Sequence, residues 1–127
     1  MEFETVICTV DQPNARGIIH PRHVAESIIA QYKEKSVTLG ELGYPNDLTI
    51  HLDNVSHSID DLWIEGDCLK AKIRVLKTPM GDKLQEMLEA GTSVSFGIAG
   101  AGIPTETNVR PDDFTLAQIH GILDENV

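Results

Sequence analysis

No stretch of this 127-residue sequence stays apolar for long enough to cross a bilayer, and its N-terminus lacks a signal-peptide pattern. Basic residues are also scarce, because ten lysines and arginines stand against twenty aspartates and glutamates, giving a formal net charge of -10. This excess of acid argues against a nucleic-acid surface, which needs basic side chains to meet the phosphates. We therefore expect a soluble protein whose partner is neither a membrane nor a nucleic acid.

Cysteine is the second shortage. Cys8 and Cys68 are the only two cysteines, and they form neither a disulfide framework nor a metal-binding spacing. The five histidines are not spaced as metal ligands either. The sequence therefore predicts reduced thiols and no metal or other cofactor.

The apolar residues that are present predict an α+β protein. Alternation predicts strands at 3–10, 48–53 and 114–123, and a hairpin with its turn at 65–67. Helical spacing predicts helices at about 21–34 and 79–90, the second with Thr78 as its N-cap and Pro79 as its first residue. No repeat or linker divides the chain, so we expect a single domain over residues 1–127.

The stretch from Thr92 to Gly102 places two serines among apolar residues and then three glycines within six positions. Its alternation predicts a strand with Val94 and Phe96 on one face and the serines on the other. A serine beside closely approaching backbone amides can act as a nucleophile. The alternative is a buried strand whose serines bond locally, because serine–glycine clusters usually mark turns.

Six short motifs follow one another along the chain. They are Pro-Asn-x-Arg-Gly at 13–17, Gly-Glu-Leu-x-x-Pro at 40–45, Val-Ser-His at 55–57, Leu-Trp-x-x-Gly at 62–66, Thr-Pro-x-Gly at 78–81, and the glycine–serine strand at 91–102. In this order the chain resembles the prohead core proteases of tailed bacteriophages, most closely the T4-like group. The resemblance extends over residues 10–123.

This resemblance implies the fold shared with herpesvirus assembly proteases, a small antiparallel β-barrel-like core with two main flanking helices. It also implies a serine–histidine endopeptidase that trims scaffold and capsid proteins inside the immature head. Ser95 matches the nucleophile position of the family.

Two positions depart from the family pattern. The family's general-base histidine follows Gly-Glu-Leu, where this sequence has Tyr44. Tyrosine is a poor substitute, because a phenol keeps its proton up to about pH 10. The segment Val94-Ser95-Phe96-Gly97 also keeps one serine and lacks the arginine that usually follows. A serine without its histidine loses most of its reactivity, since the members of such a triad act as a unit.

Another histidine could replace the missing base. His57 precedes Ser95 by 38 residues (95 − 57) on a strand that could neighbour it, and His51 and His120 are weaker candidates. For each, the alternative is a strand histidine bonded to a neighbour. We expect His20 and His23, near the start of the first helix, to lie at the surface.

Two functions therefore remain open. The first is a non-catalytic phage head protein that reuses the protease fold as a capsid-bound decoration protein or an assembly component. The second is an active maturation endopeptidase with Ser95 as nucleophile and His57 as substitute base. Either function implies phage capsid or scaffold proteins as partners, possible homo-oligomers, and a location in the virion head or in the host cytoplasm during assembly.

Overall fold

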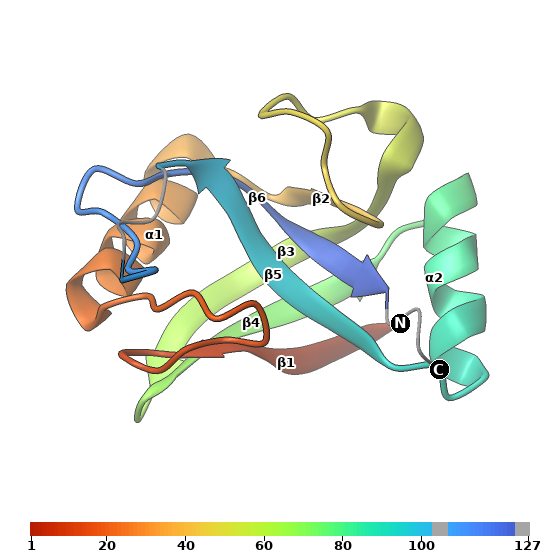
Figure 1. Ribbon diagram of the computed structural model, residues 1–127. Helices are drawn as coiled ribbons and strands as arrows, with labels where there is room; N and C mark the ends of the chain where they lie inside the picture. The colour runs from red at the N-terminus through yellow and green to blue at the C-terminus, as the bar shows by residue number, and fades with distance from the viewer. Residues whose placement is uncertain (103–106, 124–127) are drawn as a thin grey trace.

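Two antiparallel sheets cross one another in the computed structural model, which describes residues 1–102 and 107–123 (Figure 1). The larger sheet has the order β1 (Glu2–Thr9), β4 (Cys68–Val75), β3 (Val55–Glu65) and β2 (Leu39–Glu41). The smaller sheet pairs β5 (Val94–Ala101) with β6 (Thr115–Leu123). The barrel-like core is not closed, since β1 pairs only with β4, and β5 only with β6, in the described part of the chain.

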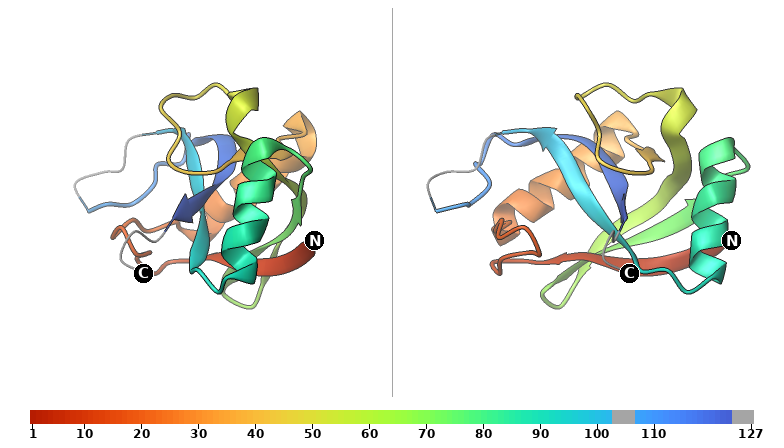
Figure 2. Two further views of the ribbon diagram at one scale, coloured as in Figure 1. Left: turned by 90° about the vertical axis from the view of Figure 1, so that its right-hand side faces the viewer. Right: turned by 45° about the vertical axis from the view of Figure 1, so that its right-hand side comes forward.

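Two helices flank the sheets, as the sequence predicts (Figure 2). Helix α1 (Arg22–Lys35) buries Val24, Ala25 and Ile28, and helix α2 (Pro79–Glu89) buries Leu84. Thr78 is confirmed as the N-cap of α2, because its side chain accepts a hydrogen bond from the Gly81 amide at 2.9 Å. Neither of these helices is long and apolar enough to cross a membrane.

The hairpin of β3 and β4 forms the floor of the core. Along β4, buried residues alternate with more exposed ones, so Leu69, Ala71 and Ile73 face the second sheet. The first five residues of β3, 55–59, are buried on both faces. Helix α2 covers this end of β3, and β6 accepts a hydrogen bond from its His57. The two sheets therefore enclose a single apolar cluster that includes Phe96 and Ile119 of the smaller sheet.

Segment 48–53 corrects the sequence prediction. The alternation of Leu48, Ile50 and Leu52 predicts a half-buried strand, but the segment is a loop leading into a short 3-10 helix, η1 (Leu52–Asn54). Leu48 and Leu52 are 58% and 74% exposed, so their alternation does not reflect a buried face. Strand β2, which the sequence does not predict, lies just before this loop.

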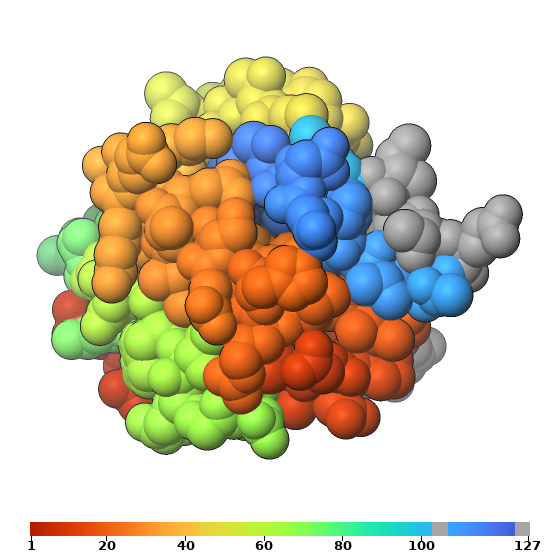
Figure 3. Space-filling model, turned by 90° about the vertical axis from the view of Figure 1, so that its left-hand side faces the viewer, coloured from red at the N-terminus to blue at the C-terminus, as the bar shows by residue number. Residues whose placement is uncertain are grey.

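Segments distant in the sequence meet at one end of the molecule, where Figure 3 shows α1 beside the segment that leads into β6. Gln31 of α1 joins the two, because its side chain bonds the Phe114 carbonyl and the Leu116 amide, each at 2.8 Å. The loop after β1 also meets residues 108–110 here, since the Ile19 amide donates to the Asn108 carbonyl at 2.8 Å.

Candidate functional site

Ser95 lies on the outer face of β5. It is exposed, whereas its neighbour Phe96 is 3% exposed and points into the core. Alternation along the strand therefore directs Ser95 and Gly97 outward together. Ser95 borders a hollow of about 160 Å³ between β5 and the loop that carries Arg16. No hydrogen bond engages its hydroxyl within the described part of the chain.

His57 lies on the other side of β5, between the two sheets. It is completely buried, its Nε2 donates to the Ile119 carbonyl at 2.9 Å, and its Nδ1 accepts from the Ser56 hydroxyl at 2.7 Å. The rings of His57 and Phe96 pack edge to face, with their centroids 4.9 Å apart. Because Phe96 and Ser95 point to opposite faces of β5, the structure does not bring His57 and Ser95 together.

Burial sets the protonation of His57. It lowers the pKa of His57 to about 4, outweighing the opposite effect of the bond to the Ile119 carbonyl, and nearby His120 lowers it further. His57 is therefore neutral at neutral pH, with both ring nitrogens engaged. These are the properties of a histidine that joins two sheets.

Tyr44 and His120 form a second part of the site, on the outer face of β5 and β6. Their rings contact one another with centroids 5.3 Å apart, and the Arg16 guanidinium lies 5.2 Å from the Tyr44 centroid. His120 pairs with Gly97 across the sheet, and a Cβ added to Gly97 would lie 3.6 Å from His120 Nε2. His120 is thus on the same face of the sheet as Ser95 and two residue pairs along the ladder from it.

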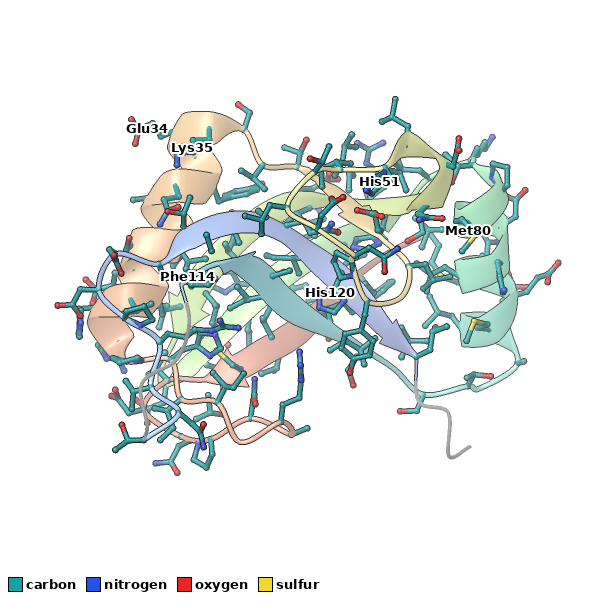
Figure 4. The ribbon with its side chains drawn as sticks, turned by 45° about the horizontal axis from the view of Figure 1, so that its top comes forward. Glu34, Lys35, His51, Met80, Phe114 and His120 are labelled. Carbon is teal, nitrogen blue, oxygen red and sulfur yellow. The ribbon has the colours of Figure 1, made fainter. Side chains whose placement is uncertain are left out.

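The backbone of Gly43 holds Tyr44 over His120. Its amide donates to the Gly121 carbonyl at 2.8 Å, and its own carbonyl accepts from His120 Nδ1 at 3.0 Å. Gly43 has a φ of +94°, which favours glycine at this position. Figure 4 shows labelled His120 beside the loop that follows β2.

A buried polar pair fixes the start of the same loop. The Glu41 amide donates to Gln118 Oε1 at 2.9 Å, and Gln118 Nε2 donates to Glu41 Oε2 at 2.6 Å. Both residues are at least 98% buried, and Asn54 Nδ2 gives Glu41 a further bond at 3.3 Å. The Gly-Glu-Leu motif therefore anchors the loop to β6, which places the next residues at the mouth of the site.

The remaining histidines lie elsewhere. His51 is an exposed loop residue bonded to Asp47, and exposed His23 bonds Asp112. The prediction of a surface position was wrong for His20, which is 2% exposed because the segment around 108–110 covers it. Within residues 1–102 and 107–123, no three histidine, cysteine or acidic side chains are grouped to hold a metal.

Sequence reasoning overlooked Arg16 and Arg110. Both line a hollow of about 540 Å³ together with Tyr44 and His120, although each is a charged residue in a loop that would ordinarily be assigned to solvent. The only available signal was the place of Arg16 in the Pro-Asn-x-Arg-Gly motif. Arg16 borders both this hollow and the smaller one beside Ser95, so the two hollows adjoin.

An antiparallel sheet with an outward serine, on a glycine-rich strand paired to a strand that carries a histidine, agrees with the architecture that the prohead-protease resemblance implies. The model of the family described as prohead core protein serine protease matches residues 2–118, so the chain belongs to that family. The family resemblance inferred from the six motifs is confirmed.

Among solved structures, the chain is similar to the bacteriophage T4 capsid assembly protease, gp21. The TM-score is 0.86 and the sequence identity 23%, over 97% of this chain and 81% of that chain. This likeness confirms the predicted α+β fold. No curated protein sequence matches the chain.

Proposed function

We propose that this phage protein keeps the prohead-protease fold without its peptidase chemistry and serves as a capsid-bound decoration or assembly component. The observation that supports this most is Tyr44, which covers His120 at the position where the family resemblance places the general base. A serine hydroxyl becomes a useful nucleophile only when a neighbouring base accepts its proton. A tyrosine phenol holds its own proton near neutral pH and cannot take that role.

The other histidines near the site do not replace the missing general base. His57 has both ring nitrogens bonded and faces Phe96 instead of Ser95. His120 donates its Nδ1 hydrogen to the Gly43 carbonyl, and no hydrogen bond joins its ring to the Ser95 hydroxyl among the described residues. The fold around them is nonetheless intact, which favours a retained binding role.

The alternative is an active serine maturation endopeptidase that cleaves scaffold and capsid proteins in the prohead. One observation favours it: His120 is buried on the same face as Ser95 and lies across from Gly97. In that case His120, and not His57, would be the nearer histidine. Cleavage of cognate head proteins that requires both Ser95 and His120 would establish this alternative.

Family membership implies phage capsid or scaffold proteins as the partners and head assembly in the host cytoplasm as the setting. We propose that the protein then stays in the virion head and that neither nucleic acid nor membrane takes part in the contact. The net charge of -10 suits a basic docking surface on a head protein.

Quantitative mass spectrometry of purified mature virions tests the proposed role. A structural protein is expected there intact and in stoichiometric amount relative to a head component. A protease that digests itself and leaves is expected to be absent or fragmented. Absence of the intact chain from mature heads would overturn the decoration role.

A further inference from the structure

The hollow lined by Arg16 and Arg110 is a basic site in an acidic protein. It has a volume of about 540 Å³, and Tyr44, Asp47 and His120 complete its polar lining. The chain carries a formal net charge of -10, so two arginines converging on one hollow stand out against the rest of the surface. The hollow adjoins the one beside Ser95 through Arg16, but the proposed function does not explain its two arginines.

Local hydrogen bonds bring the two arginines together. Asn14 Oδ1 accepts from the amides of Arg16 and Ile18, each at 2.9 Å, which forms the tight turn that presents Arg16. The Arg110 amide donates to the Ile19 carbonyl at 2.9 Å, tying its segment to the same loop. The arrangement is therefore built into the backbone and does not depend on the two side chains attracting each other.

Neither guanidinium group has an acidic partner among the described residues. Four other cations form ion pairs, namely Arg22, Lys70, Lys72 and Arg74, but neither Arg16 nor Arg110 does so among the described residues. Asp47 at the rim is already bonded to the Thr49 amide and to His51. Arg110 Nη1 donates only to the Gly102 carbonyl, at 3.1 Å, and its Nε is buried with no partner in the described chain.

The same chain offers a complementary surface on α2. Asp82, Glu86 and Glu89 are exposed and recur at spacings of four and three residues, so they share one face of the helix. None of the three forms an ion pair among the described residues. We call these three residues the acidic face of α2.

We propose that the Arg16–Arg110 hollow of one copy binds the carboxylates of the acidic face of α2 of a second copy. Arginine suits this role because its planar guanidinium can bind a carboxylate through two hydrogen bonds. Figures 1 and 2 place α2 at the end of the molecule away from loops 11–17 and 107–113. In this proposal the contact is head-to-tail, so it extends into a chain of copies unless its rotation closes a ring.

Analytical ultracentrifugation of the purified protein over a wide concentration range tests this proposal. The wild-type mass is expected to rise with concentration beyond that of a dimer, because each copy keeps one free hollow and one free acidic face. Arg16→Glu and Glu86→Arg, both at exposed positions, are each expected to weaken association at least tenfold. Lys35→Glu, an equally exposed reversal at the end of α1, serves as the matched control and is expected to leave it unchanged.

Mixing the two charge-reversed variants gives the sharper result. The arginine that Glu86→Arg introduces on α2 meets the glutamate that Arg16→Glu introduces in the hollow, so the mixture is expected to regain association that neither variant shows alone. A chain that stays monomeric overturns the proposal, as does association insensitive to these reversals. Arg16-dependent binding of an acidic peptide by a monomeric chain also overturns it, since the occupant would then be another protein. No head protein is present in this experiment, so its outcome is independent of the proposed capsid role.

Discussion

The space between the two sheets and the outer face of β5–β6 each contain an aromatic ring packed on a histidine. Between the sheets, Phe96 contacts His57, and both side chains are almost completely buried. On the outer face, Tyr44 contacts His120, but the tyrosine is 57% exposed. The first pair belongs to the packing that makes the fold, whereas the second lies where chemistry would take place. Under the proposed function, the interior packing of the protease family persists while the residues around Ser95 change.

Replacing each of the two aromatic residues with alanine is expected to give the largest difference in stability between the two regions. Phe96→Ala removes a buried ring between the sheets and should lower the free energy of unfolding by about 3–5 kcal/mol. Tyr44→Ala removes a largely exposed ring and should cost about 1 kcal/mol or less. Urea denaturation of both variants measures the difference, and comparable losses would show that the outer pair is also part of the core.

Replacing one glycine in each region with alanine tests the same difference in stability, because the added methyl group crowds the neighbouring atoms. A Cβ on Gly40 would overlap the His57 ring and the Ile119 carbonyl, two groups fixed by their mutual hydrogen bond. Gly40→Ala should therefore cost about 3 kcal/mol or prevent folding. On the outer face, a Cβ on Gly97 would crowd the flexible end of Ile122, at 2.8 Å, and would lie in ordinary contact with His120 Nε2, at 3.6 Å, so Gly97→Ala should cost less than about 1 kcal/mol. Thermal unfolding monitored by circular dichroism would reveal whether the order is reversed.

The buried histidines are expected to make stability fall in mild acid. Burial is the main cause that lowers the pKa of both His57 and His20 from 6.5 to about 4. Below pH 6.5 the unfolded chain binds protons that the folded chain refuses, so this stability is complete above pH 6.5 and is lost as the pH falls towards 4. Each histidine should contribute a loss on the order of 3 kcal/mol.

Substitution isolates this effect from other groups that titrate in acid. The difference in unfolding free energy between pH 7 and pH 4 should be smaller in His57→Gln and in His20→Gln than in the wild type. An unchanged difference in both variants would mean that neither histidine is held neutral by the fold.

Much of the fold could be predicted from the sequence because its elements follow simple periodicities. Strand β4 and both helices each bury one apolar face, and Thr78 marks the start of α2. The same reasoning wrongly predicted a strand at 48–53, because Leu48 and Leu52 alternate with polar residues but are exposed. It also missed the short strand β2. Period alone does not reveal which alternating segments another sheet will cover.

The site was less accessible to prediction. Ser95 and Tyr44 could be identified from motifs, but the burial of His57 depends on residues 55–59 being covered on both faces. The approach of Arg16 to Arg110 depends on hydrogen bonds between segments about ninety residues apart in the sequence. Both features depend on tertiary contacts, which leave no local pattern in the sequence.

The central claim is that the outer face of β5–β6 lacks a competent base for Ser95. Its most direct test compares the wild-type protein with Ser95→Ala in cleavage of the cognate scaffold and capsid proteins near neutral pH. The account predicts no product that depends on Ser95, so the two proteins should give the same result. Turnover by the wild type that disappears in Ser95→Ala would contradict it.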